Sequence, residues 1–188
     1  MSEPVSALPG FRNEGMISVV EAGPCGMITM RGDLTLPALA KAMTDVMKAD
    51  IPAQRRITHC DHGRVAWMSP DELLLITDYG AVPGIIGDLQ SAIGDAFVSL
   101  ADVSDARAVF RLSGPQVCDV LAKICPVDFA AFEVGEIRRT RAAQVAAALL
   151  RDAEHAFTLV CFRSVAQYMG DLLATVSAPG GEVGLYRG

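Results

Sequence analysis

The segment that most restricts the fold spans residues 104–129, where a strand pattern passes directly into a helix pattern. In residues 106–112 the even-numbered positions are all apolar and would share one face of a short strand. Apolar residues then recur at helical spacing from Val117 to Ile124, and Pro126 disfavours helical geometry at the residue before it. The segment therefore predicts a strand and a helix that share one layered core.

Two serines are placed to cap helices. Ser113 and Ser164 each precede a glutamine by three residues, Gln116 and Gln167, which is the spacing of a capping box. The serine hydroxyl would accept the glutamine N–H, and the glutamine side chain would bond back. A second strand pattern precedes Ser164, so two strand–helix units lie about 50 residues apart and indicate a duplicated half-motif. Because the chain has no G-x-S-x-G motif, we interpret both serines as caps rather than nucleophiles.

Shorter patterns predict the remaining elements. We expect a β-hairpin over residues 16–30, with its turn at Gly23 to Gly26. Apolar spacing and alternation predict helices at 36–47 and 82–93 and strands at 55–59, 65–68, 73–77, 97–103 and 157–162. This order predicts an α+β fold in which antiparallel or mixed sheets carry helices on one face.

The expected domain organisation is simple. Residues 1–15 form a flexible N-terminal segment. Residues 16–178 form a single compact α+β unit made of two lobes, at about 16–103 and 104–178. Residues 179–188 are a Gly-rich tail that lies on a neighbour or is disordered.

Composition restricts the partners and the compartment. The net charge of −6 argues against nucleic-acid or anionic-membrane binding. No secretory signal pattern or span-length apolar run is visible in the 188 residues, so we expect a soluble cytoplasmic protein. The five irregularly spaced cysteines do not form a disulfide framework. An apolar fraction of 51% with a mean hydropathy of +0.33 fits a chain whose surface is partly covered by a partner.

Four adjacent residues have side chains that can bind metals: His59, Cys60, Asp61 and His62. On a strand, alternate residues face opposite sides, so the four side chains could not converge on one ion without a turn. We therefore favour a surface turn over a metal site. The glycines match neither the dinucleotide-binding nor the phosphate-binding motif.

Other reactive groups have simpler structural explanations. Cys118 and Cys125 lie two helical turns apart and are interpreted as buried thiols, with Lys123 the one nearby cation in that helix. Ser104 lies next to Asp105 but in no hydrolase motif. We expect Trp67 to anchor a core or an interface.

Two basic runs are present, Arg138, Arg139 and Arg141, and Arg55 with Arg56. A solvated or partner-facing edge is the favoured role for them. The alternative is an anion site for the glutamate tail of a folate. We assign no catalytic, cofactor-binding or metal-binding residue to the chain.

Several segments resemble the gamma subunit of heterotetrameric sarcosine oxidase and, more distantly, the folate-binding aminomethyltransferase (glycine-cleavage T protein) superfamily. The resemblance extends from about Met16 onward and is carried by WMSPDELLLIT (67–77), VSDARAVFRLSGPQVCDVLAKICPVD (103–128), RTRAAQV (139–145) and CFRSVAQYMGDLL (161–173). It implies two ferredoxin-like split βαβ halves, as in aminomethyltransferase folate-binding domains. It also implies a strand over residues 141–151, hairpinned through 152–155 to 157–162. We favour that strand over the helix that the alanines alone would predict, because tertiary pairing often overrides propensity.

The resemblance also implies a function. In that family the enzyme demethylates sarcosine oxidatively to glycine and H₂O₂, and the methyl carbon leaves as formaldehyde or as methylene-tetrahydrofolate. The alpha subunit binds NAD and tetrahydrofolate and contacts gamma directly, beta carries FAD and FMN, and delta holds zinc. Gamma would then support assembly without a cofactor or catalytic residues of its own. The alternatives are a free-standing folate- or small-amine-binding domain of the aminomethyltransferase superfamily and, least favoured, a one-carbon enzyme in its own right.

Overall fold

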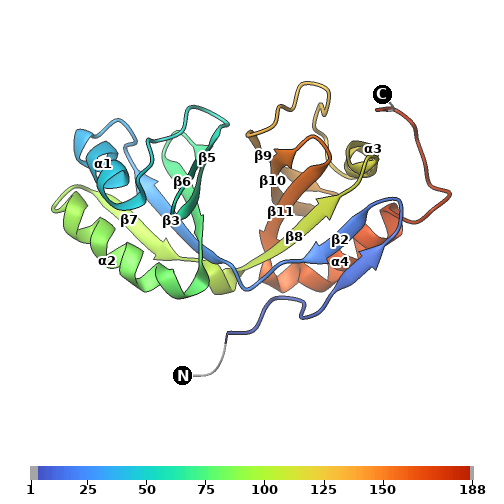
Figure 1. The fold of residues 1–188 in the computed structure, drawn as a ribbon, viewed down its shortest axis with the longest axis horizontal. Coiled ribbons are helices and arrows are strands. Elements are labelled where there is room, and N and C mark those ends of the chain that lie inside the picture. Colours follow the sequence, from blue (N-terminus) through green and yellow to red (C-terminus); the bar gives the residue numbers. More distant parts are fainter. Residues whose placement is uncertain (1–3, 187–188) are drawn as a thin grey trace. The chain divides into compact units, whose positions relative to one another are not determined.

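The computed structural model describes residues 4–186 and divides them into two compact units (Figure 1). One unit contains residues 25–104. The other combines residues 4–24 with residues 105–186. The structure differs here from the predicted lobes, because residues 16–24 belong with the C-terminal part of the chain and not with the lobe at 16–103.

The unit of residues 25–104 is built on a five-stranded sheet in the order β4-β5-β6-β3-β7, with every neighbouring pair antiparallel. Its strands are β3 (Gly26–Gly32), β4 (Ile57–Cys60), β5 (Gly63–Ser69), β6 (Glu72–Thr77) and β7 (Val98–Asp102). Its helices are α1 (Pro37–Ala42), which continues as the π-helical η1 (Met43–Met47), the 3-10 turn η2 (Tyr79–Ala81) and α2 (Val82–Ile93).

The helices of this unit cover one face of the sheet. Alternation directs Ile28 and Met30 of β3 to the same side as the helices, where both are fully buried. Helix α2 buries Val82, Ile85 and Leu89 against them, a spacing of three and four residues that fits one helical face. Pro37 begins helix α1, where its missing N–H has no cost.

The second unit contains a six-stranded sheet in the order β1-β2-β8-β11-β10-β9, again antiparallel throughout. Its strands are β1 (Arg12–Glu14), β2 (Ser18–Glu21), β8 (Arg107–Ser113), β9 (Ile137–Ala142), β10 (Val145–Ala153) and β11 (Ala156–Phe162). Its helices are α3 (Val117–Ala122) and α4 (Ala166–Val176), and the 3-10 turn η4 (Arg163–Val165) follows β11. The 3-10 turn η3 (Ser104–Ala106) spans the point in the sequence where one unit ends and the other resumes.

Strand alternation again supplies the core. Phe110 of β8 faces Leu159 of β11, and both are fully buried among Val120 of α3 and Leu173 of α4. The predicted α+β class, with antiparallel sheets and helices on one face, is therefore confirmed. No helix in residues 4–186 combines the length and the apolar character needed to cross a bilayer.

The predicted hairpin over residues 16–30 is wrong. Strand β2 pairs with β8, with Val19 opposite Leu112, whereas β3 pairs with β6 and β7 in the other sheet. Val19 and Ile28 are both fully buried, but in different cores. The turn residues made the hairpin plausible locally, and burial against distant strands decided the pairing.

The strand expected over residues 141–151 is confirmed for 145–151, whereas 141–142 end strand β9 and 143–144 form the turn between the two strands. Strand β10 pairs with β9 on one side and with β11 on the other, and Leu149 and Leu150 are fully buried. The alanines thus occupy a central strand, because burial in the sheet outweighs their helix propensity.

Both ends of the described chain are more ordered than expected. Arg12–Glu14 form strand β1, and the Phe11 ring packs edge-to-face on Phe110 with centroids 6.0 Å apart. Near the other end, the Tyr186 N–H donates to Asp119 Oδ1 at 2.8 Å, and the Tyr186 ring packs on Phe129. The outermost positions of both predicted tails, 1–3 and 187–188, lie outside the described residues.

Candidate functional site

The four potential metal ligands lie at a surface turn, as predicted. His59 and Cys60 end strand β4, while Asp61 and His62 form the turn into β5, and all but the half-buried Cys60 are exposed. Within residues 4–186, no group of three or more His, Cys, Asp or Glu side chains is arranged to hold a metal ion. The turn simply connects two antiparallel strands.

The thiols of the second unit behave as apolar core groups. Burial raises the pKa of Cys125 and of Cys161 from 9.0 to about 12, so both are neutral thiols at physiological pH. Burial also raises the pKa of the half-buried Cys118. Lys123, the cation considered as a partner for these thiols, donates instead to the Val176 carbonyl at 2.8 Å and so binds the end of helix α4.

The predicted capping role of Ser113 is wrong. Ser113 is the last residue of strand β8, opposite both Ala156 and Ser18. Helix α3 begins later, at Val117, whose N–H bonds to the Gly114 carbonyl at 3.1 Å, and its first turn has no side-chain cap. Strand pairing on both sides of β8 holds Ser113 in the sheet, which leaves it too far from the helix to act as a cap.

Ser164 is not a cap either. It lies inside the 3-10 turn η4, and neither this turn nor helix α4 has a side-chain cap. The Gln167 side chain does not bond back but donates to Asp171 Oδ1 at 2.9 Å, one turn further along the helix. The 3-10 turn satisfies the first N–H groups through the backbone and makes a capping side chain unnecessary.

Ser104 has a structural role that the sequence did not reveal. Its side chain is buried, its hydroxyl donates to Asp102 Oδ1 at 2.6 Å, and its oxygen accepts the Met27 N–H at 2.9 Å. These bonds connect the end of β7 to the start of β3. Because the hydroxyl group is buried and makes both hydrogen bonds, we assign Ser104 no role as a nucleophile.

The arginine run does not converge on one site. Arg138 faces the helix-covered side of β9, where it pairs with Glu136 at 2.6 Å and lies over the Phe132 ring at 4.8 Å. Arg139 and Arg141 project from the other face, because neighbouring strand residues alternate. The run thus forms a charged sheet edge rather than a single anion pocket, and Arg55 and Arg56 are likewise exposed before strand β4.

Trp67 is a core anchor. Its side chain packs against the hydrophobic core of the 25–104 unit, and its backbone N–H donates to the Arg56 carbonyl at 3.1 Å. This matches the role expected for the chain's single tryptophan.

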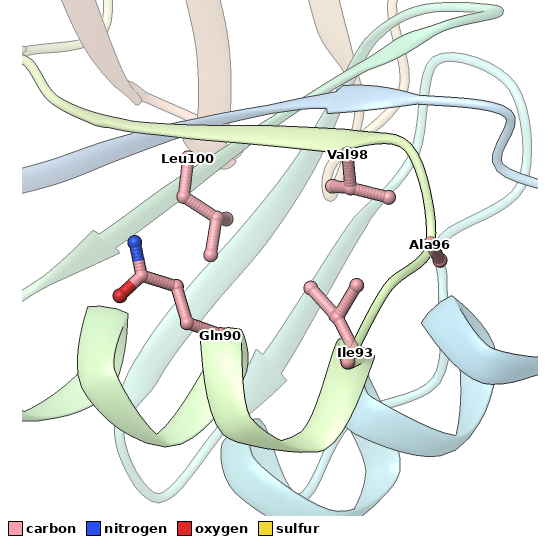
Figure 2. Close-up of a pocket in the computed structure, with 6 residues that line it drawn as sticks. Gln90, Ile93, Ala96, Val98 and Leu100 are labelled. Atoms are coloured by element: carbon pink, nitrogen blue, oxygen red, sulfur yellow. The ribbon is translucent and has the colours of Figure 1, made fainter.

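The surface around strand β7 combines an unpaired strand edge, an exposed aromatic residue and two hollows. It was not identified from the sequence. Strand β7 is an edge of its sheet, and Phe97, just before it, is 98% exposed. A hollow of about 90 Å³ lies on the α2 side of the strand, lined by Gln90, Ile93, Gly94, Ala96, Val98 and Leu100 (Figure 2). A second hollow, of about 290 Å³, is lined by Arg31, Gly32, Asp71, Phe97, Val98 and Ser99.

The sequence does contain one signal for this surface. Phe97 has the same strand parity as Ser99 and Ala101, so a large aromatic residue occupies the polar side of the pattern, away from Val98 and Leu100. The Phe97 residue is exposed and not packed in the core. An exposed aromatic beside an unpaired strand edge is suited to binding a polypeptide, because it supplies both apolar area and backbone hydrogen-bonding groups.

Solved structures share this fold. A chain of the heterotetrameric sarcosine oxidase from Corynebacterium sp. U-96, in complex with pyrrole 2-carboxylate, superposes with a TM-score of 0.82 at 23% identity, covering 94% of this chain and 92% of that one. The glycine cleavage system aminomethyltransferase T from Bartonella henselae superposes with a TM-score of 0.63 at 14% identity, covering 82% of this chain and 44% of that one. The expected fold relationship to both groups is confirmed.

Sequence comparison identifies the family. Sarcosine oxidase gamma subunits from Arthrobacter sp. and Corynebacterium sp. (strain U-96) are 37% and 34% identical over 95 and 98 residues. These alignments cover 50% and 51% of this chain, and the chain spans about half the length of these curated relatives, 46% and 47%. The model of the sarcosine oxidase, gamma subunit family matches residues 31–179. Because that match includes most of both units, the chain belongs to the sarcosine oxidase gamma subunit family.

Proposed function

We propose that this chain is the gamma subunit of a heterotetrameric sarcosine oxidase and that its role is in assembly. The observation that carries the proposal is the family match over residues 31–179. The curated relatives are named sarcosine oxidase subunit gamma, and the chain of the Corynebacterium enzyme with the same fold comes from a heterotetramer.

The proposed parent enzyme oxidises the N-methyl group of sarcosine, with O₂ reduced to H₂O₂. Water then releases the methyl carbon as formaldehyde, or tetrahydrofolate accepts it as the methylene derivative, and glycine is the other product. In this proposal the partner subunits hold FAD, FMN, NAD, tetrahydrofolate and zinc. The chain contacts the alpha subunit directly, forms a cytoplasmic complex that also contains beta and delta, and binds none of these cofactors itself.

Two sets of observations support an assembly role. Side chains that could have carried chemistry have structural partners, since Ser104 connects two strands, Arg138 pairs with Glu136, and the buried thiols stay protonated. In addition, the β7 edge with the exposed Phe97 offers a surface for a partner chain. Exposed aromatic residues are typical anchors of protein interfaces.

The test is purification of the tagged chain from its native cell and, separately, from a host that lacks the other subunits. The native preparation should contain flavin-bearing subunits and oxidise sarcosine. The isolated chain should show neither flavin absorbance nor turnover, even with added FAD and FMN. A native preparation without flavoprotein subunits, or an isolated chain that oxidises sarcosine, would overturn the proposal. Saturable binding of tetrahydrofolate to the isolated chain would favour a folate-binding domain instead.

A further inference from the structure

We propose that strand β7 binds an extended segment of another subunit, which adds to the five-stranded sheet as a further antiparallel or parallel strand. The identity of the partner as a subunit of the same enzyme rests on the proposed function. The mode of binding rests on the geometry of β7 alone. Strand addition gives affinity through main-chain hydrogen bonds and specificity through hollows that take alternate side chains.

The backbone of β7 is oriented for such pairing. The Val103 N–H donates to the Met27 carbonyl at 2.9 Å, next to the register pair of Asp102 and Ile28, so Val103 occupies a hydrogen-bonded position of the antiparallel ladder. In such a ladder, hydrogen-bonded and non-hydrogen-bonded pairs alternate. Leu100, opposite Met30, and Asp102, opposite Ile28, therefore direct their N–H and C=O groups away from β3 and toward the outer edge.

The other sheet edges of the described chain are less suited to a partner. Strand β9 carries Arg138, Arg139 and Arg141, and charged residues on an edge discourage further pairing. Strand β1 has three residues, one of them Arg12, and β4 has four. Strand β7 has five residues, VSLAD, with no Lys, Arg or Pro. It is longer than β1 and β4 and carries none of the basic residues of β9.

Hollows lie on both faces of strand β7. The smaller hollow is on the α2 side, where Figure 2 shows Gln90 and Ile93 pointing toward Val98 and Leu100 of β7. The larger hollow is lined by Ser99, whose side chain projects from the other face of the strand, and by the exposed Phe97 ring. Successive side chains of an added strand point to opposite faces, so neighbouring residues of the partner would lie alternately beside Val98 and Leu100 on the α2 side and beside Phe97 and Ser99 on the other side.

The charges at this edge define the chemistry of the partner segment. Asp95 precedes β7, Asp102 ends it, and Asp71 lines the larger hollow. The cation of that hollow, Arg31, is paired with Glu72 at 2.8 Å. A segment with apolar side chains and a flanking Lys or Arg is therefore complementary. A second copy of β7 would bring the same carboxylates to the edge, and like charges oppose that pairing.

Hydrogen exchange on the native complex tests strand addition directly. The amides of Leu100 and Asp102 should exchange roughly tenfold or more slowly in the complex than in the isolated chain, because a new strand would bond them. The β4 edge of the same sheet is the internal control and should not change. A complex that forms without slower exchange in β7 would overturn strand addition while leaving the assembly role intact. Failure of the complex to form would overturn both.

Variants at exposed positions test the side-chain contacts without affecting folding. Phe97→Ala should weaken binding to the partner subunits about tenfold or more, as expected of a central anchor. Val134→Ala, at a valine that is 52% exposed in the other unit, is the matched control and should bind normally. Ser99→Lys should weaken binding more than Ser99→Glu, since the partner segment is basic. The proposal would be contradicted if Phe97→Ala and Val134→Ala weakened binding equally, or if Ser99→Glu weakened it more than Ser99→Lys. It would also be contradicted if the chain associated with itself and Phe97→Ala abolished that association.

Discussion

The hydroxyl group of Ser104 holds the end of strand β7 in place. It donates to the Asp102 carboxylate and accepts the Met27 N–H, and it is buried while doing so. Buried polar groups are costly to leave without a partner, so removing the hydroxyl would orphan the Met27 N–H as well as the carboxylate. The same bonds hold the end of β7, the strand to which we assign partner binding.

We therefore expect Ser104→Ala to lower the free energy of unfolding by about 1–3 kcal/mol, the cost of a buried unsatisfied donor. Ser113→Ala is the matched control. Ser113 is exposed and does not cap helix α3, so its replacement should change the free energy of unfolding by no more than about 0.5 kcal/mol. Urea denaturation of both variants measures the difference. A larger loss in Ser113→Ala than in Ser104→Ala would mean that the capping interpretation was correct after all.

Residue-scale prediction failed where a local motif competed with distant pairing. The S-x-x-Q spacing at Ser113 is correct for a cap, but it contains no information about strands β2 and β11, which extend β8 through that residue. The surface nature of the His59 turn, by contrast, follows from strand alternation within a few residues and was predicted correctly. Local chemistry is visible in the sequence, and the identity of the neighbouring strand is not.

At the scale of elements, the turn between β9 and β10 carries local strain. Ala142 and Val145 are paired, so Ala143 and Gln144 form a two-residue turn, and Ala143 has φ of +50°. Gln144 is not among the positive-φ residues, which fits a type II′ turn, whose first central position normally holds glycine. A left-handed conformation costs an L-residue roughly 1–2 kcal/mol, and here sheet pairing on both sides enforces it.

Ala143→Gly should thus raise the free energy of unfolding by about 1 kcal/mol, because glycine adopts this φ without the Cβ clash. The control is Ala146→Gly, at an exposed position of strand β10. It should lower the free energy of unfolding by roughly 0.5–1 kcal/mol, because glycine weakens an ordinary strand. Thermal unfolding of the two variants provides the comparison. Destabilisation by both substitutions to the same extent would show that the turn is not strained.

Elements with a strong period were predictable, and their pairing was not. Helix α2 and strands β5 and β6 lie close to their predicted positions because several apolar residues define each one. The partner of β2 depended on a burial site in a strand about 90 residues away, which no local pattern contains. The status of β7 as an edge has the same origin, since it follows from the whole strand order. The candidate surface therefore had one weak signal in the sequence, namely that Phe97 alternates in phase with Ser99 and Ala101 and not with the apolar residues Val98 and Leu100.

For the molecule as a whole, the division into two units has consequences for cooperativity. Each unit has its own sheet and its own buried cluster, centred on residues such as Leu75 in one and Leu159 in the other. The sequence had predicted one compact unit over residues 16–178, made of two lobes at about 16–103 and 104–178. If the units open separately, exchange of backbone amides reports their stabilities independently.

Leu75→Ala and Leu159→Ala test this division as a matched pair, because both leucines are fully buried in central strands. Such truncations remove apolar contacts and leave a cavity, with costs of about 2–5 kcal/mol. In native-state hydrogen exchange, Leu75→Ala should accelerate exchange in β3 and β6 far more than in β8 and β11, and Leu159→Ala should do the reverse. If either variant accelerated amide exchange equally in all four strands, the chain would unfold as a single cooperative unit. A cavity in one core would then lower the free energy of unfolding of the whole chain.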